Sequence, residues 1–246
     1  MRRYIYFVFL LCCAVNLLLT SCVRQKYVVM DMVHHNPGEV MTESKFLDPS
    51  FLKKNEYGAK VFFLFEAAQF GIDWKSFDPS LFPDTTEAGR WVAEKAEIIH
   101  KKYDAAKKED LQVYCMLDML VLPSLLVEKH RTELTNEQGK LDISKPYTQL
   151  CIRELMKEMF ETFPQLDGLV IRTGETYLHD APYYVGNHPV QNGMYDHITL
   201  INLLREEVCE RRNKKLFYRT WDMGQLHSIP KYYLSVTDSI EPHPNL

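Results

Sequence analysis

The stretch GLVIRTGETY, residues 168–177, joins a short apolar run to an abrupt polar end. Its first four residues are continuously apolar, which is typical of a strand buried on both faces of a parallel sheet. Arg172, Gly174 and Glu175 follow at once, so charged side chains stand where the strand ends. The stretch predicts a central parallel strand with polar groups at its carboxyl end.

Apolar runs of strand length recur along the chain and alternate with long amphipathic segments. The runs cover residues 27–33, 59–65, 111–117, 168–173, 216–221 and 233–236. The amphipathic segments, with apolar residues every three or four positions, cover residues 84–106, 147–163 and 195–212. Such alternation predicts an α/β fold with a parallel sheet, either open and doubly wound or closed as a (β/α) barrel.

Two features favour the barrel. No strand is followed by a glycine-rich turn with the spacing of a phosphate-binding loop, and the chain has only 10 glycines. Long loops rich in aromatic and polar residues follow two strands, at 69–83 and 175–195. We therefore predict a (β/α)8 TIM-barrel-like fold. About six strands are present where a barrel needs eight, so we expect the N-terminal part of a longer enzyme. A smaller open α/β fold is the alternative.

The N-terminus has the features of an export signal. Arg2 and Arg3 precede an apolar run over 4–19, and the tetrapeptide LTSC then ends at Cys22. The run is shorter than a bilayer-spanning helix requires. The tetrapeptide resembles the lipobox of bacterial lipoproteins, which implies removal of residues 1–21 and lipidation of Cys22. The expected location is the bacterial cell envelope, anchored by lipid at the outer membrane or facing the periplasm.

The composition predicts one folded domain over 27–246, attached through a tether at 22–26. With 46% hydrophobic and 25% charged residues, the chain can bury one sizeable core. A net charge of −4 without a basic stripe excludes a nucleic-acid partner. Besides the lipidated Cys22, three cysteines follow the signal, Cys115, Cys151 and Cys209, and an odd number argues against a disulfide framework. Cys115 lies in an apolar run and Cys151 near the apolar face of a predicted helix, so buried thiols are expected. Their spacing fits no zinc motif, and we predict neither a metal nor a cofactor.

Glu175 is the candidate catalytic residue, because it stands at the predicted mouth of the barrel. Gly174 permits a tight turn, and Arg172 could hold Glu175 or a substrate carboxylate in a fork of donors. In the following loop, Tyr177 and His179 supply an aromatic face and hydrogen-bonding groups that suit a sugar. The alternatives are a surface carboxylate that caps the next element and, for Arg172, a structural ion pair.

Other strand ends carry polar or aromatic residues of the same kind. His34 follows the first strand, Asp118 ends the third, and Arg219, Trp221 and Asp222 end the fifth. Residues from several strands build one pocket at the carboxyl end of a barrel, so these are candidate substrate-binding residues. Alternatively, Asp118 pairs within the mouth of the core and Trp221 packs in the core.

The chain resembles barrel glycoside hydrolases whose acid/base Glu follows strand four and whose nucleophile Glu follows strand seven. The resemblance rests on Arg-Thr-Gly-Glu at 172–175, Trp-Asp at 221–222 and Glu-Pro-His-Pro-Asn at 241–245. The chain also resembles carbohydrate-active lipoproteins of Bacteroidetes-type bacteria, some of them α-glucuronidase-like. This resemblance implies a carbohydrate ligand and an acid/base role for Glu175. Gly174 stands where those hydrolases usually carry Asn.

The leading hypothesis is an exported, lipid-anchored glycoside hydrolase, or a fragment of one, that acts on polysaccharide or oligosaccharide. Arg172 and Arg219 suggest acidic glycans. A glycan-binding lipoprotein without catalysis is the alternative.

Overall fold

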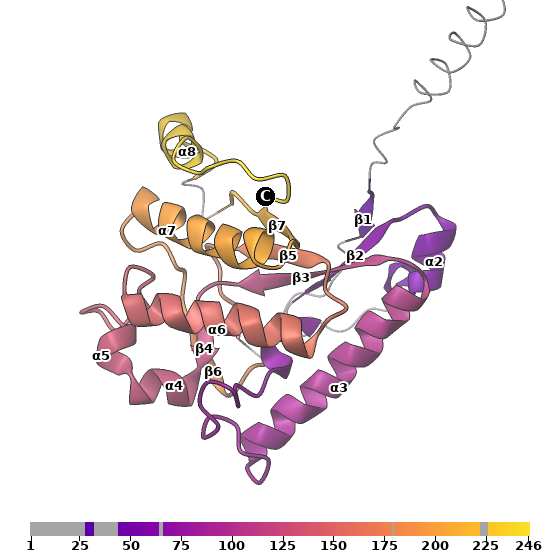
Figure 1. The fold of residues 1–246 in the computed structure, drawn as a ribbon, viewed down its shortest axis with the longest axis horizontal. Helices are drawn as coiled ribbons and strands as arrows, with labels where there is room; N and C mark the ends of the chain where they lie inside the picture. Colours follow the sequence, from indigo (N-terminus) through magenta and orange to yellow (C-terminus); the bar gives the residue numbers. More distant parts are fainter. Residues whose placement is uncertain (1–27, 32–43, 64–65, 179, 222–225) are drawn as a thin grey trace, which may run out of the picture.

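The computed structural model describes residues 28–31, 44–63, 66–178, 180–221 and 226–246. A five-stranded sheet in the order β1-β2-β3-β5-β7 forms its centre (Figure 1). The strands are β1 (Met30–Asp31), β2 (Ala59–Phe63), β3 (Gln112–Asp118), β5 (Gly168–Arg172) and β7 (Lys215–Tyr218). All neighbouring strands are parallel, and their spatial order follows their order along the chain.

Three long helices separate the strands β2, β3, β5 and β7 along the chain. They are α3 (Glu87–Lys108), α6 (Pro146–Thr162) and α7 (Met194–Leu204), which continues as the π-helical segment η4 (Arg205–Glu210). The shorter helices are η1 (Lys45–Leu47), α2 (Pro49–Lys54), η3 (Ala68–Gly71), α4 (Ser124–Lys129), α5 (Arg131–Leu134) and α8 (Pro230–Thr237). A small antiparallel sheet pairs β4 (Val121–Pro123) with β6 (Tyr184–Gly186).

Local chemistry explains where the long helices begin and end. The Thr86 side chain accepts a hydrogen bond from the backbone N–H of Gly89, so α3 begins after Thr86 and slightly later than the predicted start at 84. Pro146 occupies the first turn of α6, where a backbone N–H has no partner within the helix, so the N–H that proline lacks is not needed. The last residue of α6 is Thr162, Phe163 is its C-cap, and Pro164, which cannot continue a helix, follows. The three predicted helical segments are confirmed.

The two faces of the sheet are packed differently. The main core joins one face to all three long helices; its members include Phe62, Cys115, Leu117, Leu169, Ile171 and Leu216 from the sheet and Ile99, Tyr103, Ile152, Met156, Leu200 and Leu204 from the helices. A separate cluster covers the other face, here called the inner face, and consists of Ala59, Val61, Phe63, Tyr114, Met116 and Val170, with Met30 and Tyr177 against it.

This arrangement decides between the two predicted architectures. In an open doubly wound sheet, helices cover both faces and the strand order reverses at a switch point. Here the three long helices pack on one face, and the strand order runs in one direction. The sheet is therefore wound as in a (β/α) barrel, and five barrel-type strands are described where about six were predicted.

The sixth predicted strand is wrong, because residues 233–236 lie inside α8. A short apolar run cannot be assigned to strand or helix by its pattern alone. Pro230 at the first turn favours the helix, which buries Val236 and leaves Leu234 54% exposed. Of the first predicted strand, only Met30–Asp31 is a strand among the residues described.

Several predictions concern residues that the structure does not describe. These are the signal at 1–21, Cys22, the tether at 22–26, His34, His179 and Asp222. The predicted burial of Cys115 and Cys151 is confirmed, and Cys209 is buried as well. None of the helices in the described part of the chain combines the length and apolar composition that a bilayer crossing requires.

Candidate functional site

Three charged side chains stand in a row at the carboxyl ends of neighbouring strands. Asp118 of β3 is in register with Arg172 of β5. Ile171 is in register with Tyr218, so Arg219 lies one position on, beside Arg172. Residues in register on a sheet point to the same side, and alternation along the strands places this row on the inner face. The sheet edge therefore carries an Asp-Arg-Arg row on the side away from the long helices.

Asp118 and Arg172 form a buried, two-pronged ion pair. Nη2 of Arg172 donates to Oδ2 of Asp118 at 2.6 Å, and Nε donates to Oδ1. The two side chains are 2% and 6% exposed. The backbone N–H of Tyr177 also donates to Oδ2 of Asp118, at 2.9 Å. The donor fork of Arg172 is thus taken by Asp118 and not by Glu175, and the pair anchors the loop that follows β5.

Glu175 is held at the mouth of this row and remains 42% exposed. Its Oε2 accepts a hydrogen bond from the hydroxyl of Tyr177 at 2.9 Å and lies 3.9 Å from Nη1 of Arg172. The hydrogen bond to this carboxylate raises the pKa of Tyr177, so the phenol stays protonated as a donor at neutral pH. The positive φ of Gly174 turns the backbone here, and its N–H donates to Nδ1 of His188. The carboxylate is therefore both oriented and open to solvent.

Aromatic rings pack against the guanidinium of Arg172. Its Cζ lies 5.1 Å from the ring centroid of Phe63 and 4.6 Å from that of Tyr177. Such contacts are attractive and become stronger where water is excluded. One face of the Tyr177 ring therefore packs on Arg172, and the Tyr177 hydroxyl donates to Glu175.

Arg219 differs from its neighbour in its partners. Its backbone N–H donates to the carbonyl of Ile171, which extends the pairing of β5 and β7, and its Nη1 lies 3.8 Å from Sδ of Met116. Among the described residues, no carboxylate forms an ion pair with its guanidinium. Burial, and then the charge of Arg172, lower the pKa of Arg219. The site thus holds a second, partly buried cation.

Of the predicted site residues that remain, the structure describes Trp221. Trp221 is 47% exposed and lies over His227, with 4.7 Å between ring centroids, so the alternative that it packs in the core is wrong. Phe63 and Met116 also contact the arginines of this site and were not predicted for it. Strand alternation could have indicated Met116, because it places Met116 on the same face as Asp118, two residues later.

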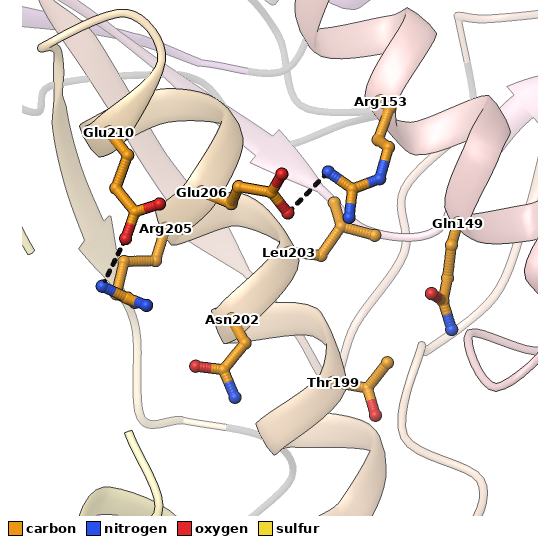
Figure 2. Close-up of a pocket in the computed structure, with 8 residues that line it drawn as sticks. All are labelled: Gln149, Arg153, Thr199, Asn202, Leu203, Arg205, Glu206 and Glu210. Carbon is orange, nitrogen blue, oxygen red and sulfur yellow. Dashed lines mark ion pairs between the residues drawn. The ribbon is translucent and has the colours of Figure 1, made fainter. Parts of the chain in front are cut away.

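A separate hollow of about 380 Å³ lies between α6 and the α7–η4 segment (Figure 2). It is lined by Gln149, Arg153, Thr199, Asn202, Leu203, Arg205, Glu206 and Glu210. Its charged side chains pair with one another: Arg153 with Glu206 at 2.8 Å and Arg205 with Glu210 at 2.7 Å. Because these charges are neutralised internally and lie in the helix layer, we place the candidate site at the sheet edge.

Comparisons with known proteins show a similarity of fold to solved structures. No family model matches the chain, and no curated protein matches it. The fold is similar to that of a noncanonic maltogenic alpha-amylase, AmyB from Thermotoga neapolitana, at 12% sequence identity and a TM-score of 0.44. The match covers 80% of this chain and 46% of the amylase chain, so it spans about half the length of that enzyme.

Proposed function

We propose that this protein is a glycoside hydrolase-like, carbohydrate-active protein with Glu175 as its general acid/base. The supporting observation is the Glu175 carboxylate, which is oriented by Tyr177 and Arg172, partly exposed, and located just beyond the carboxyl end of β5. Enzymes with barrel-type winding carry their catalytic residues at that end of the strands. An oriented carboxyl group that solvent can reach is what protonation of a glycosidic oxygen requires.

Hydrolysis of this kind usually needs two carboxyl groups, one on each side of the scissile bond. Asp118 does not qualify as the second, because Arg172 and the Tyr177 N–H occupy its oxygens. Glu66, just beyond β2, forms an ion pair with Lys102 of α3 and so faces the helix layer. In the described part of the chain, Glu175 is therefore the one partly exposed carboxylate in this row.

Both carboxylate oxygens of Asp118 are engaged within the protein, which favours a second candidate function, glycan binding without catalysis. A single oriented carboxylate, together with aromatic and guanidinium groups, can recognise sugar hydroxyls without cleaving a bond. Turnover distinguishes the two functions, because binding alone releases no reducing end.

The test compares the full wild-type chain with Glu175→Gln. The measurements are 4-nitrophenol release from a panel of 4-nitrophenyl glycosides, reducing ends released from oligosaccharides, and oligosaccharide affinity by calorimetry. Removing a general acid/base should slow hydrolysis of oligosaccharides by about 10²–10⁴-fold, while they still bind. Glu137→Gln, which changes an exposed glutamate elsewhere, is the matched control.

Each outcome has a distinct meaning. Oligosaccharide hydrolysis that survives in Glu175→Gln contradicts the catalytic role of Glu175, because a sugar leaving group needs the proton that 4-nitrophenolate does not. Binding without any turnover, weakened in Glu175→Gln, supports the glycan-binding alternative. A wild-type chain that neither binds nor cleaves any member of the panel contradicts both functions.

We also propose that the protein is exported and anchored to the bacterial cell envelope through lipid on Cys22. The support is the order of charged, apolar and LTSC segments within the first 22 residues. In a bacterial host fed radioactive palmitate, the full chain should carry label and sediment with membranes. Cys22→Ser should lose both properties, whereas Cys12→Ser should keep them. Label that persists in Cys22→Ser would contradict the anchor.

A further inference from the structure

The charged row on the inner face holds two guanidinium groups side by side. Arg172 and Arg219 occupy neighbouring positions on the parallel strands β5 and β7. Like charges directly beside one another on a sheet are destabilising. The charge of Arg172 lowers the pKa of Arg219, as expected from close approach of two cations. Negative charge nearby would stabilise these two adjacent guanidinium groups.

The carboxylates that flank the row are already engaged. Asp118 accepts two hydrogen bonds from Arg172 and a third from the backbone of Tyr177. Glu175 accepts from the Tyr177 hydroxyl and lies 3.9 Å from Arg172. Neither carboxylate forms an ion pair with Arg219 in the described structure, although both are close enough to favour its charged form.

The thioether of Met116 is a poor hydrogen-bond partner for the guanidinium of Arg219. Its Nη1 lies 3.8 Å from the thioether sulfur of Met116, and such a sulfur is only a weak acceptor. Guanidinium is a planar fork of donors suited to a carboxylate or another oxyanion. Removing a cation from water without a counter-ion is costly, and burial is the main reason for the lowered pKa of Arg219. An incoming anion would satisfy the donors and offset both effects.

We propose that Arg219 binds the oxyanion of an acidic glycan, either a uronate carboxylate or a sulfate ester. This inference names the ligand class of the proposed function and rests on it. Arg219 is a specificity residue here, because it holds a charged substituent and takes no part in bond cleavage. Trp221, two residues further on and 47% exposed, offers a flat aromatic surface for the apolar face of a sugar ring.

The test uses pairs of oligosaccharides that differ only in charge. Oligogalacturonates are compared with their methyl esters, and sulfated galactan oligosaccharides with their desulfated forms, by calorimetry on the full chain. We expect one charged form to bind about tenfold to a hundredfold more tightly than its uncharged partner, as a charged hydrogen-bonded pair allows. The pair that shows this preference tells carboxylate from sulfate.

Variants assign the preference to Arg219. Arg219→Gln should abolish it while the affinity for the uncharged partner stays within about twofold, because only one charged contact is removed. Arg219→Lys should keep part of the preference, since it retains the charge and loses the planar fork. Arg131→Gln removes an exposed arginine of α5 and should leave the preference unchanged. Urea unfolding verifies that each variant is folded.

Three outcomes would overturn the inference. Equal binding of charged and uncharged glycans to the wild type would overturn it and leave the proposed function standing. A preference that survives in Arg219→Gln would place the anion elsewhere. Failure to bind any glycan, charged or not, would overturn the proposed function as well. If Arg219→Gln does not fold, the wild-type pairs and Arg219→Lys still decide, because loss of the fork alone should reduce the preference.

Discussion

At the scale of single residues, the Asp118–Arg172 pair is the most consequential contact of the site. Both side chains are nearly inaccessible, so Asp118→Asn removes the buried counter-ion of Arg172 and leaves only the partly exposed Glu175, 3.9 Å away. Breaking a buried pair from one side typically costs about 3–5 kcal/mol. We expect the free energy of unfolding of Asp118→Asn to fall by about that amount in urea denaturation.

An exposed pair supplies the control for this prediction. Asp84 pairs with Lys75 at 3.1 Å and its side chain is 80% exposed, so Asp84→Asn should change stability by only about 0–1 kcal/mol. The double variant Asp118→Asn/Arg172→Met should recover part of the loss, because the unpaired charge is then removed. Equal costs for Asp118→Asn and Asp84→Asn would show that the buried pair is not held as described.

The sequence predicted the positions of these residues but not their partners. Asp118 and Arg172 were recognised as strand-end residues because an apolar run stops at each of them. Their pairing depends on the register of β3 against β5 across 54 residues of chain. No pattern within either strand specifies that register by itself.

At the scale of elements, β5 and β7 approach each other closely at Gly168. A Cβ atom added there would lie 2.1 Å from the carbonyl oxygen of Lys215, which is too close for any side chain. Gly168→Ala should force the two strands apart and lower stability by about 1–3 kcal/mol, as overpacking does. Urea unfolding measures the loss. Compared with the wild type, Gly168→Ala should exchange its amide hydrogens faster, and the increase should be larger in β7 than in β2. Unchanged exchange in β7 would contradict the close approach.

A second element-scale prediction concerns the loop at 77–80 and helix α4. The Lys129 Nζ of α4 donates to Asp78 at 2.8 Å, and this bond together with Ser80 lowers the pKa of Asp78 to about 2. In the unfolded chain this carboxyl titrates near its usual value of about 3.9. The unfolded state therefore takes up the proton first as the pH falls, and the contribution present above about pH 4 is lost towards pH 2.

Asp78→Asn tests this contribution. Unfolding midpoints of the wild type and of Asp78→Asn are compared in urea between pH 7 and pH 2. The stability of the variant should decline less steeply below pH 4, because it lacks the titrating group. Parallel pH profiles for the two proteins would argue against the Asp78–Lys129 bond.

The elements themselves were predictable to different degrees. Helices α3, α6 and α7 follow from a 3.6-residue pattern that is written locally over many turns. The run at 233–236 was too short for its pattern to distinguish a strand from the helix α8 that it forms. The sheet of β4 and β6 was not predicted, because each strand is three residues long and joins segments far apart in sequence.

At the scale of the whole molecule, one core buries three thiols from three different elements. Cys115 lies in β3, Cys151 in α6 and Cys209 in η4, and all belong to the main hydrophobic core. Burial raises the pKa of Cys115 and Cys151 to about 12 and that of Cys209 to about 11. At pH 7 each is therefore a protonated, inaccessible thiol.

Alkylation by iodoacetamide, mapped by mass spectrometry of peptides, should show that these three cysteines unfold together. In native buffer the peptides carrying them should stay unlabelled. With increasing urea all three should gain label over one concentration range, which coincides with the loss of circular dichroism, because a single core protects them. Labelling of Cys209 well before Cys115 would indicate that η4 opens separately from the sheet.

The sequence by itself determined the alternation of strands and helices, the α/β fold class with a parallel sheet, the burial of Cys115 and Cys151 and the position of Glu175 just beyond a strand end. These features follow from local patterns of apolar and polar residues. The structure then decided for barrel-type winding. The tertiary structure alone decided that Asp118 occupies the fork of Arg172, that Arg219 stands beside it with no carboxylate paired to it among the described residues, and that Tyr177 orients Glu175. The physical reason is register, because these contacts exist only once β3, β5 and β7 lie side by side.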